Sequence, residues 1–185
     1  GDFGLMYDSP CIEAGDPSCA LPDNGGWIVD IGAVEYTGTR HRRSVTGMGE
    51  LLFGGRVRAK VNVTARGSLS EIDMTVHPGE THYAAPAGVS RWYDIDHTGT
   101  GMEFDLTLSY LDSELNGCDE DSLKAWRWTG AWDGPKTPAA RDLAAGWIRV
   151  DGQTGFSDWI IAGESLPVDA GDMPGATRLL ANYPN

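Results

Sequence analysis

The fold is decided by the stretch Met102-Glu103-Phe104-Asp105-Leu106-Thr107-Leu108-Ser109-Tyr110, in which apolar residues alternate with polar ones. A period of two is that of a β-strand with one face in a core and the other toward water. Similar runs, some of them shorter, occur at Val57–Val63, Ile72–Val76, Leu123–Trp128, Trp147–Val150 and Phe156–Ala162. Turn signals such as Asn116-Gly117 separate them. Because about seven short strands between turns are typical of a sandwich, we predict an all-β fold with an antiparallel β-sandwich over residues 51–163.

The regions on either side of these strands have weaker patterns. Residues 1–38 are rich in turn signals and contain one alternating run, Trp27–Tyr36. Residues 39–50 contain scattered glycines and the basic cluster Arg40-His41-Arg42-Arg43, so we expect a linker there, with a docking patch as the alternative. Residues 164–185 are polar and rich in proline and glycine, which is typical of a linker or tail. Only Arg141–Ala145 has a helical pattern, for one turn at most.

Composition narrows the classes of function. The 185 residues carry a formal net charge of −13 at pH 7, which disfavours nucleic acid and anionic lipid head groups as partners. No run of about 18 apolar residues is present, so we expect no membrane insertion. The first residues lack the basic and apolar regions of a signal peptide, so we expect a fragment whose signal lies upstream. Of Cys11, Cys19 and Cys118, we expect any disulfide to join the first two and leave Cys118 free.

Residues 1–37 resemble a known family in two segments. Residues 9–17 read Ser-Pro-Cys-Ile-Glu-Ala-Gly-Asp-Pro, and residues 30–36 read Asp-Ile-Gly-Ala-Val-Glu-Tyr. Together they resemble the closing segment of secreted bacterial right-handed parallel β-helix repeat proteins, with Glu13 for the usual Asp and Val34 for the usual Tyr. The resemblance implies that residues 1–38 form a terminal β-helix coil or cap. A short strand between tight turns agrees with this, because it can finish a stack of coils but cannot form a core alone.

Later segments resemble modules that often follow such repeats in bacterial exoproteins. A β-sandwich module of this kind is similar to three segments of the chain, Trp92–Ile95, Phe104–Leu115 and Ser122–Trp132. Phe156–Gly163 resembles its closing strand. Leu180-Ala181-Asn182-Tyr183-Pro184-Asn185 resembles the entry to the C-terminal sorting domain of type IX secretion substrates. The resemblance implies a parent protein that is extracellular or at the cell surface, with the secretion machinery as a partner through a missing C-terminal domain. It implies no catalytic residue in this chain.

An acidic turn is the candidate metal site. Oxygen-bearing side chains alternate before the glycine of Asp112-Ser113-Glu114-Leu115-Asn116-Gly117, and more carboxylates follow. Such oxygens suit Ca²⁺, but Leu123 stands where an EF-hand needs a bidentate Glu. We therefore expect either an irregular calcium site or an ordinary acidic hairpin turn. The candidate ligands are Asp112, Glu114, Asn116, Asp119 and Asp121.

Trp126, Trp128 and Trp132 are the candidates for carbohydrate binding. A tryptophan ring offers a broad apolar face, on which the apolar face of a sugar can stack. Trp126 and Trp128 are two residues apart and therefore share one face of a strand. The alternative is a buried stripe of core side chains, which is the commoner use of tryptophan.

Candidates for catalysis are weaker. His77-Pro78-Gly79-Glu80-Thr81-His82 brings two imidazoles near a carboxylate, but Pro-Gly forbids the helix of a His-Glu-x-x-His zinc site. A metal-binding loop or a polar turn remains. Asp94-Ile95-Asp96-His97 places carboxylates beside an imidazole, yet no serine lies in a nucleophile-elbow motif. We therefore expect no enzyme activity from this chain and no cofactor other than calcium.

Three hypotheses for function follow. The first is a non-catalytic structural region that caps a β-helix and acts as a spacer. The second is a β-sandwich that binds extracellular glycan or calcium, which an exposed aromatic row would favour. The third is a fragment of a polysaccharide-degrading β-helix enzyme whose active site lies upstream.

Overall fold

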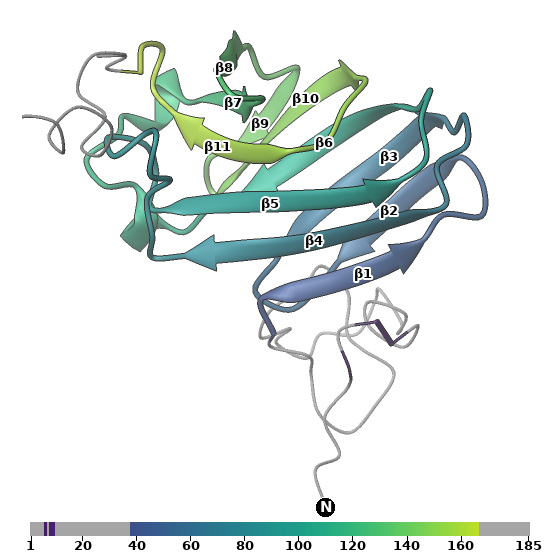
Figure 1. Cartoon of the computed structure of the whole chain (residues 1–185). Coiled ribbons are helices and arrows are strands. Elements are labelled where there is room, and N and C mark those ends of the chain that lie inside the picture. The colour runs from purple at the N-terminus through teal and green to yellow at the C-terminus, as the bar shows by residue number, and fades with distance from the viewer. Residues whose placement is uncertain (1–5, 7, 10–37, 167–185) are drawn as a thin grey trace, which may run out of the picture.

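The structure is a computed structural model that describes Met6, Asp8, Ser9 and residues 38–166. Within these residues the chain forms eleven strands and two short 3-10 helices. The predicted all-β fold is confirmed as two antiparallel sheets that lie face to face (Figure 1). The expected Cys11–Cys19 pair and nearly all of the expected β-helix cap and C-terminal tail lie outside the described residues.

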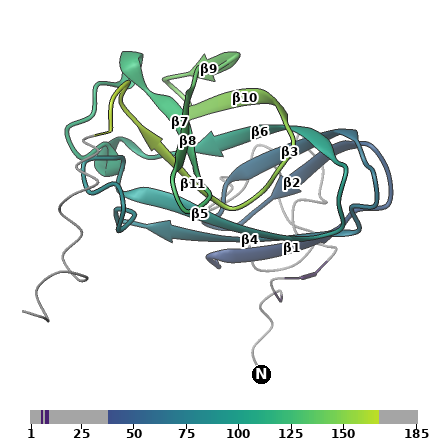
Figure 2. The same cartoon turned by 45° about the horizontal axis from the view of Figure 1, so that its top comes forward.

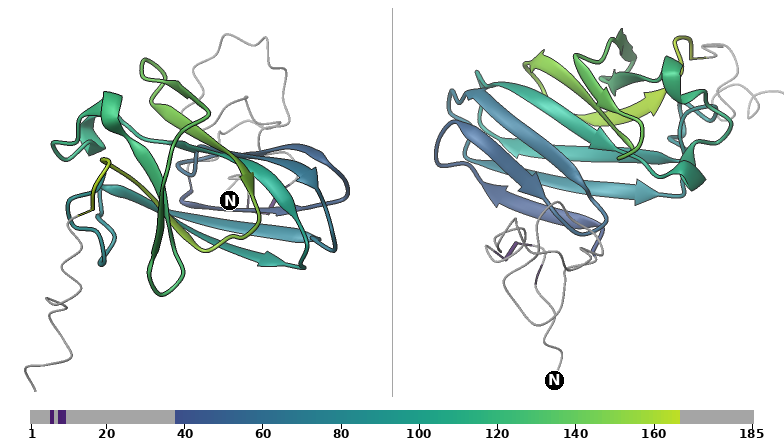
Figure 3. Two further views of the ribbon diagram at one scale, coloured as in Figure 1. Left: turned by 90° about the horizontal axis from the view of Figure 1, so that it is seen from above. Right: turned by 180° about the vertical axis from the view of Figure 1, so that it is seen from behind.

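One layer is a six-stranded sheet and the other a five-stranded sheet, as the further views in Figure 2 and Figure 3 show. In order across the six-stranded sheet lie β1 (Arg40–Ser44), β4 (Glu71–Pro78), β5 (Arg91–Thr98), β11 (Asp158–Ala162), β7 (Lys124–Trp128) and β8 (Trp132–Lys136). In order across the five-stranded sheet lie β2 (Gly49–Phe53), β3 (Ala59–Ala65), β6 (Glu103–Ser109), β10 (Trp147–Gln153) and β9 (Ala140–Asp142). The 3-10 helices η1 (Asp112–Glu114) and η2 (Glu120–Ser122) connect β6 to β7.

The core lies between the two sheets and follows the alternation of the sequence. Phe104 and Leu106 of β6 are fully buried and belong to the same apolar cluster as Ile72 of β4 in the other sheet. Each such side chain contributes about 1.5–3 kcal/mol by leaving water. One polar contact also links the layers, because the Tyr93 hydroxyl of β5 donates to the Ser109 carbonyl of β6 at 2.6 Å. The outward residues of each strand are therefore left to form the two outer faces.

The expected linker at residues 39–50 is wrong, since this region contains β1 and the beginning of β2. Strand β1 pairs along its length with β4, and its two outward arginines, Arg40 and Arg42, both bind the Asp73 carboxylate. His41 points inward, is fully buried and accepts a hydrogen bond from the Gly54 amide at 2.7 Å. The basic cluster is thus part of the fold, which begins at Arg40 and not at residue 51.

Other strands also differ from expectation. The structure has more strands than the seven expected, because β5, β8 and β9 were not singled out by alternation. In β5 the inward side chain of Arg91 breaks the apolar pattern. The helical turn expected at Arg141–Ala145 is wrong, since β9 ends at Asp142 and a turn follows. Among the described residues, no helix is long and apolar enough to cross a membrane.

Candidate functional site

The outer face of the five-stranded sheet presents a row of polar side chains. Lys60 of β3 is in register with Thr107 of β6, which is in register with Arg149 of β10. Their sequence neighbours Val61 and Leu106 point into the core. Since successive side chains of a strand point to opposite faces, Lys60, Thr107 and Arg149 lie side by side on the outer face.

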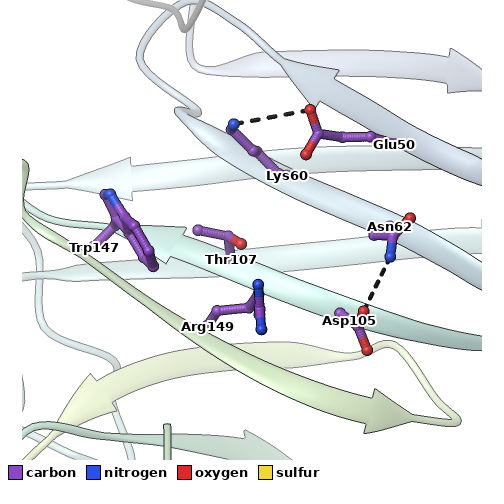
Figure 4. A pocket seen from close by; sticks show the side chains of 7 residues that line it. All are labelled: Glu50, Lys60, Asn62, Asp105, Thr107, Trp147 and Arg149. Atoms are coloured by element: carbon purple, nitrogen blue, oxygen red, sulfur yellow. Dashed lines mark hydrogen bonds and ion pairs between the residues drawn. The ribbon is translucent and has the colours of Figure 1, made fainter. Parts of the chain in front are cut away.

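This face is hollowed around the row, with a cavity volume of about 210 Å³. Figure 4 shows Thr107 in the middle of the lining side chains, between Lys60 and Arg149, with Trp147 on one side and Asp105 on the other. Strands β2, β3, β6 and β10 all contribute to what we call the hollow. Its lining residues are Glu50, Lys60, Asn62, Asp105, Thr107, Trp147 and Arg149.

Two of the lining side chains are held in place by hydrogen bonds. The Asn62 amide nitrogen donates to Asp105 Oδ2 at 3.0 Å, and the Gly152 backbone amide donates to Asp105 Oδ1 at 3.1 Å. Both oxygens of Asp105 therefore have an N–H donor. This end of the hollow presents fixed hydrogen-bonding groups, which cost little further entropy when a ligand binds.

Each of the two cations of the hollow has an acidic partner at the rim. Lys60 Nζ lies 3.8 Å from Glu50 Oε1, and the Glu50 side chain is 54% exposed. Arg149 binds Asp151 through two N–H groups at 2.7 and 3.3 Å, and both side chains are more than 40% exposed. Exposed ion pairs contribute only about 0–1 kcal/mol each. The cations are therefore oriented by their partners but can still be engaged by a ligand.

Trp147 gives the hollow its aromatic side. It begins β10, is half-buried and stands two residues before Arg149 on the same strand face. A large flat ring beside hydrogen-bonding groups is suited to a ligand with one apolar face and a polar edge. The lining contains neither His nor Cys.

The three tryptophans expected to bind carbohydrate lie on the opposite side of the molecule and do not form one platform. Trp126 is 6% exposed, packs with Ile160 and Leu166, and donates its indole N–H to the Gly163 carbonyl at 3.2 Å. The platform prediction is wrong for Trp126. Trp128 and Trp132 are half-buried, and their ring centroids are 4.9 Å apart.

Trp128 and Trp132 belong to an aromatic cluster on the outer face of the six-stranded sheet. His82 lies at its centre and is 1% exposed, with ring centroids of Trp92 and Trp132 each 5.1 Å away. Its Nδ1 accepts from the Ala84 amide, so its Nε2–H donates to Asp158 Oδ2 at 3.1 Å. These contacts fasten the loop between β4 and β5 onto the sheet. The members of the cluster are His77, His82, Tyr83, Trp92, Trp128 and Trp132.

The histidines and the carboxylate that the sequence offered as catalytic candidates do not come together in one site. His77 stacks on Trp92 at 3.7 Å between centroids and does not meet His82 in a metal site. His97 packs against Phe156 at the other end of β5, with a centroid distance of 5.2 Å. Burial, followed by the charges of Asp158 and Asp96, raises the pKa of Asp94 above its ordinary value. This carboxyl faces water from the same sheet as the aromatic cluster, with Asp158 opposite it on β11.

The acidic turn shows no formed calcium site. Among residues 38–166, no group of three or more His, Cys, Asp or Glu side chains is placed to hold a metal ion. Glu114 is 6% exposed, and its carboxylate takes two hydrogen bonds from Arg91 at 2.7 and 3.2 Å. Asn116 donates to the Gly88 carbonyl, and Asp119 caps η2 by accepting from the Asp121 amide. Asp112 and Asp121 are exposed. Glu114, a candidate calcium ligand in the sequence, thus has its carboxylate engaged by Arg91, where it supports the fold.

Sequence reasoning missed the hollow. The sequence does contain a signal, which is three pairs of residues two positions apart that share one strand face. The pairs are Lys60 with Asn62, Asp105 with Thr107, and Trp147 with Arg149. Each pair alone is an ordinary solvated strand face. Only the pairing of β3, β6 and β10 brings the three pairs together, and the sequence does not state which strands are neighbours.

No protein-family model matches the chain, and neither a curated protein nor a solved structure matches it. The resemblance of residues 1–37 to β-helix repeat proteins, and that of the last residues to a sorting domain, therefore stay predictions. The fold and the hollow carry the functional argument.

Proposed function

We propose that the chain is a non-catalytic carbohydrate-binding β-sandwich module that holds a glycan in the hollow of its five-stranded sheet. The observation that carries the proposal is the combination of Trp147 on β10 with the fixed hydrogen-bonding side chains of Asn62 on β3 and Asp105 on β6. A sugar ring has an apolar face that stacks on an indole and an edge of hydroxyl groups that both donate and accept. Asn62, Thr107 and Asp105 supply the matching donors and acceptors.

The size of the hollow fits one ring of a longer chain. Its volume of about 210 Å³ is below the roughly 300–1,000 Å³ of pockets that enclose a small molecule. A hexose has about a dozen non-hydrogen atoms, and roughly 0.3 kcal/mol for each gives a binding free energy of about −4 kcal/mol. This corresponds to a Kd of about 1 mM. We therefore expect weak binding to each ring, strengthened when several copies of the module act together.

The setting of the module is part of the proposal. The resemblances at the two ends of the sequence support a secreted or surface-attached parent, in which the module acts near the cell surface on extracellular glycan. The main alternative is a spacer that joins other domains and binds nothing. The third hypothesis, a degrading enzyme with its active site upstream, is compatible with a binding module in the same chain.

The test is a glycan-array screen followed by calorimetry on the best oligosaccharide. Trp147→Ala should weaken binding by roughly tenfold or more, because the stacking surface is lost. Tyr83→Ala is the matched control, since Tyr83 is an aromatic residue that is 67% exposed in the aromatic cluster of the other sheet. We expect no change from it. No binding by the wild type would favour the spacer, and loss of binding in Tyr83→Ala alone would move the site to the aromatic cluster.

A further inference from the structure

The charges of the hollow are distributed unevenly. Lys60 and Arg149 flank Thr107 in one cross-strand row at its centre. Of the carboxylates, Glu50 is at the exposed rim, and Asp105 already accepts two N–H donors. The count of charges in the lining is balanced, and its two cations are the charged residues directly in register with Thr107 at the centre.

We infer that the glycan is anionic, and that a uronic acid carboxylate sits over Thr107 between Lys60 and Arg149. This inference rests on the proposed function of the same hollow. Neighbouring strands are about 4.8 Å apart, so the Cα atoms of the two cations are about 10 Å apart on either side of Thr107. Side chains of their length converge on one carboxylate from that distance, and a guanidinium binds a carboxylate through two parallel N–H groups.

Trp147 then sets the position of the sugar ring. It lies on the Arg149 strand, and Figure 4 shows it beside the Lys60–Thr107–Arg149 row and away from Asn62 and Asp105. A ring stacked on Trp147 directs its carboxylate toward the row, and the hydroxyl groups next along the glycan reach Asn62 and Asp105. The two types of contact are thus separated along the strands, with the charge contact between them.

The net charge of −13 does not prevent this. The Debye length is about 8 Å at physiological ionic strength, whereas two packed sheets are about 10 Å apart. The carboxylates on the outer face of the six-stranded sheet are more than about 10 Å from a ligand in the hollow, so they interact with it more weakly than the charges in the lining. The charges nearest to the ligand dominate its electrostatic energy, and those directly beside Thr107 are Lys60 and Arg149.

The charge of Glu50 gives the sharpest test, since its removal should improve binding. The probes are a galacturonic acid trisaccharide and its neutral counterpart, a galactose trisaccharide, measured by calorimetry at low salt. We expect Glu50→Gln to bind the acidic probe about two- to fivefold more tightly, because Lys60 loses its competing partner. Lys60→Gln should bind it about tenfold more weakly, and Lys60→Arg should restore most of the affinity. For the neutral probe, both Glu50→Gln and Lys60→Gln should change the affinity much less than for the acidic probe, because its rings carry no charge that Lys60 attracts or Glu50 repels.

The outcomes separate the inference from the proposed function. If the wild type binds the two probes with equal affinity, and Trp147→Ala binds neither, the inference of an anionic ligand is overturned and the proposal of carbohydrate binding stands. Weaker binding of the acidic probe by Glu50→Gln would also overturn it. If neither probe nor any array glycan binds, the proposed function fails and this inference fails with it. Thermal melts of each variant show that a change in affinity does not arise from unfolding.

Discussion

Replacing Glu114 with Ala should destabilise the fold strongly, because it leaves a buried charge without its partner. Arg91 is 2% exposed and donates two hydrogen bonds to Glu114 and one, at 2.7 Å, to the Arg56 carbonyl. Glu114 Oε2 also accepts from the Leu111 amide at 3.0 Å. After the substitution, the guanidinium keeps one acceptor and stays in a region that water does not reach.

The size of the effect follows from that burial. Breaking a buried ion pair by removing one partner costs about 3–5 kcal/mol. For a folded unit of this size, 1 kcal/mol lowers the melting temperature by about 3–4 °C, so Glu114→Ala should lower it by roughly 10–20 °C. Asp112→Ala is the matched control, since Asp112 stands on the same 3-10 helix and is exposed. Its effect should be within about 0.5 kcal/mol.

Chemical denaturation and thermal melts of both variants measure these differences. Replacing both partners together, as in Arg91→Met with Glu114→Met, should recover much of the lost stability, because no charge is then left buried. Adding Ca²⁺ or a chelator should not change the wild-type melting temperature. A loss below about 1 kcal/mol in Glu114→Ala would refute the reasoning, and so would a calcium-dependent rise in the melting temperature that this variant abolishes.

Two further predictions concern the fold. Burial, followed by the charge of Arg43, lowers the pKa of His41 from 6.5 to about 3. Below about pH 6.5 the unfolded state therefore binds a proton on His41 that the folded state does not bind. The protein should lose stability as the pH falls through this range. Melting temperatures recorded from about pH 7 to about pH 4 should fall more steeply for the wild type than for His41→Gln, and equal slopes would contradict this. A Cβ at Gly99 (φ +117°) would lie 2.3 Å from the Ser68 carbonyl oxygen, whereas one at Gly130 (φ +93°) meets nothing within 4 Å. Gly99→Ala should therefore cost more than about 3 kcal/mol, against about 1 kcal/mol for Gly130→Ala, and similar losses in denaturation would rule out the close contact.

Much of the fold could be predicted from alternation. The runs at residues 57–63, 72–76 and 102–110 become β3, β4 and β6 with small shifts at their ends. Two of the strands that were missed, β1 and β5, have a polar residue at an inward position. His41 in β1 and Arg91 in β5 are buried through hydrogen bonds to distant residues, and no local pattern reveals such partners.

The site was harder to predict than the fold. Tryptophan spacing drew attention to Trp126 and Trp128, but a loop and Leu166 cover Trp126 in the folded chain. The hollow depends on register, because Lys60, Thr107 and Arg149 are far apart in sequence and meet only through strand pairing. The sequence therefore shows which residues share one face of a single strand. Only the structure shows which strands are neighbours, and hence which residues form a binding face across the sheet.

Nuclear magnetic resonance mapping tests carbohydrate binding in the hollow most directly. The chain has seven tryptophans, each with an indole N–H signal, and a millimolar titration with the array-selected oligosaccharide follows all of them together with the backbone amides. We predict that the Trp147 indole and the amides of Thr107 and Arg149 shift, while the indole of the fully buried Trp159 does not. Shifts confined to Tyr83 and Trp128, or no shifts at all, would contradict a glycan site in the five-stranded sheet.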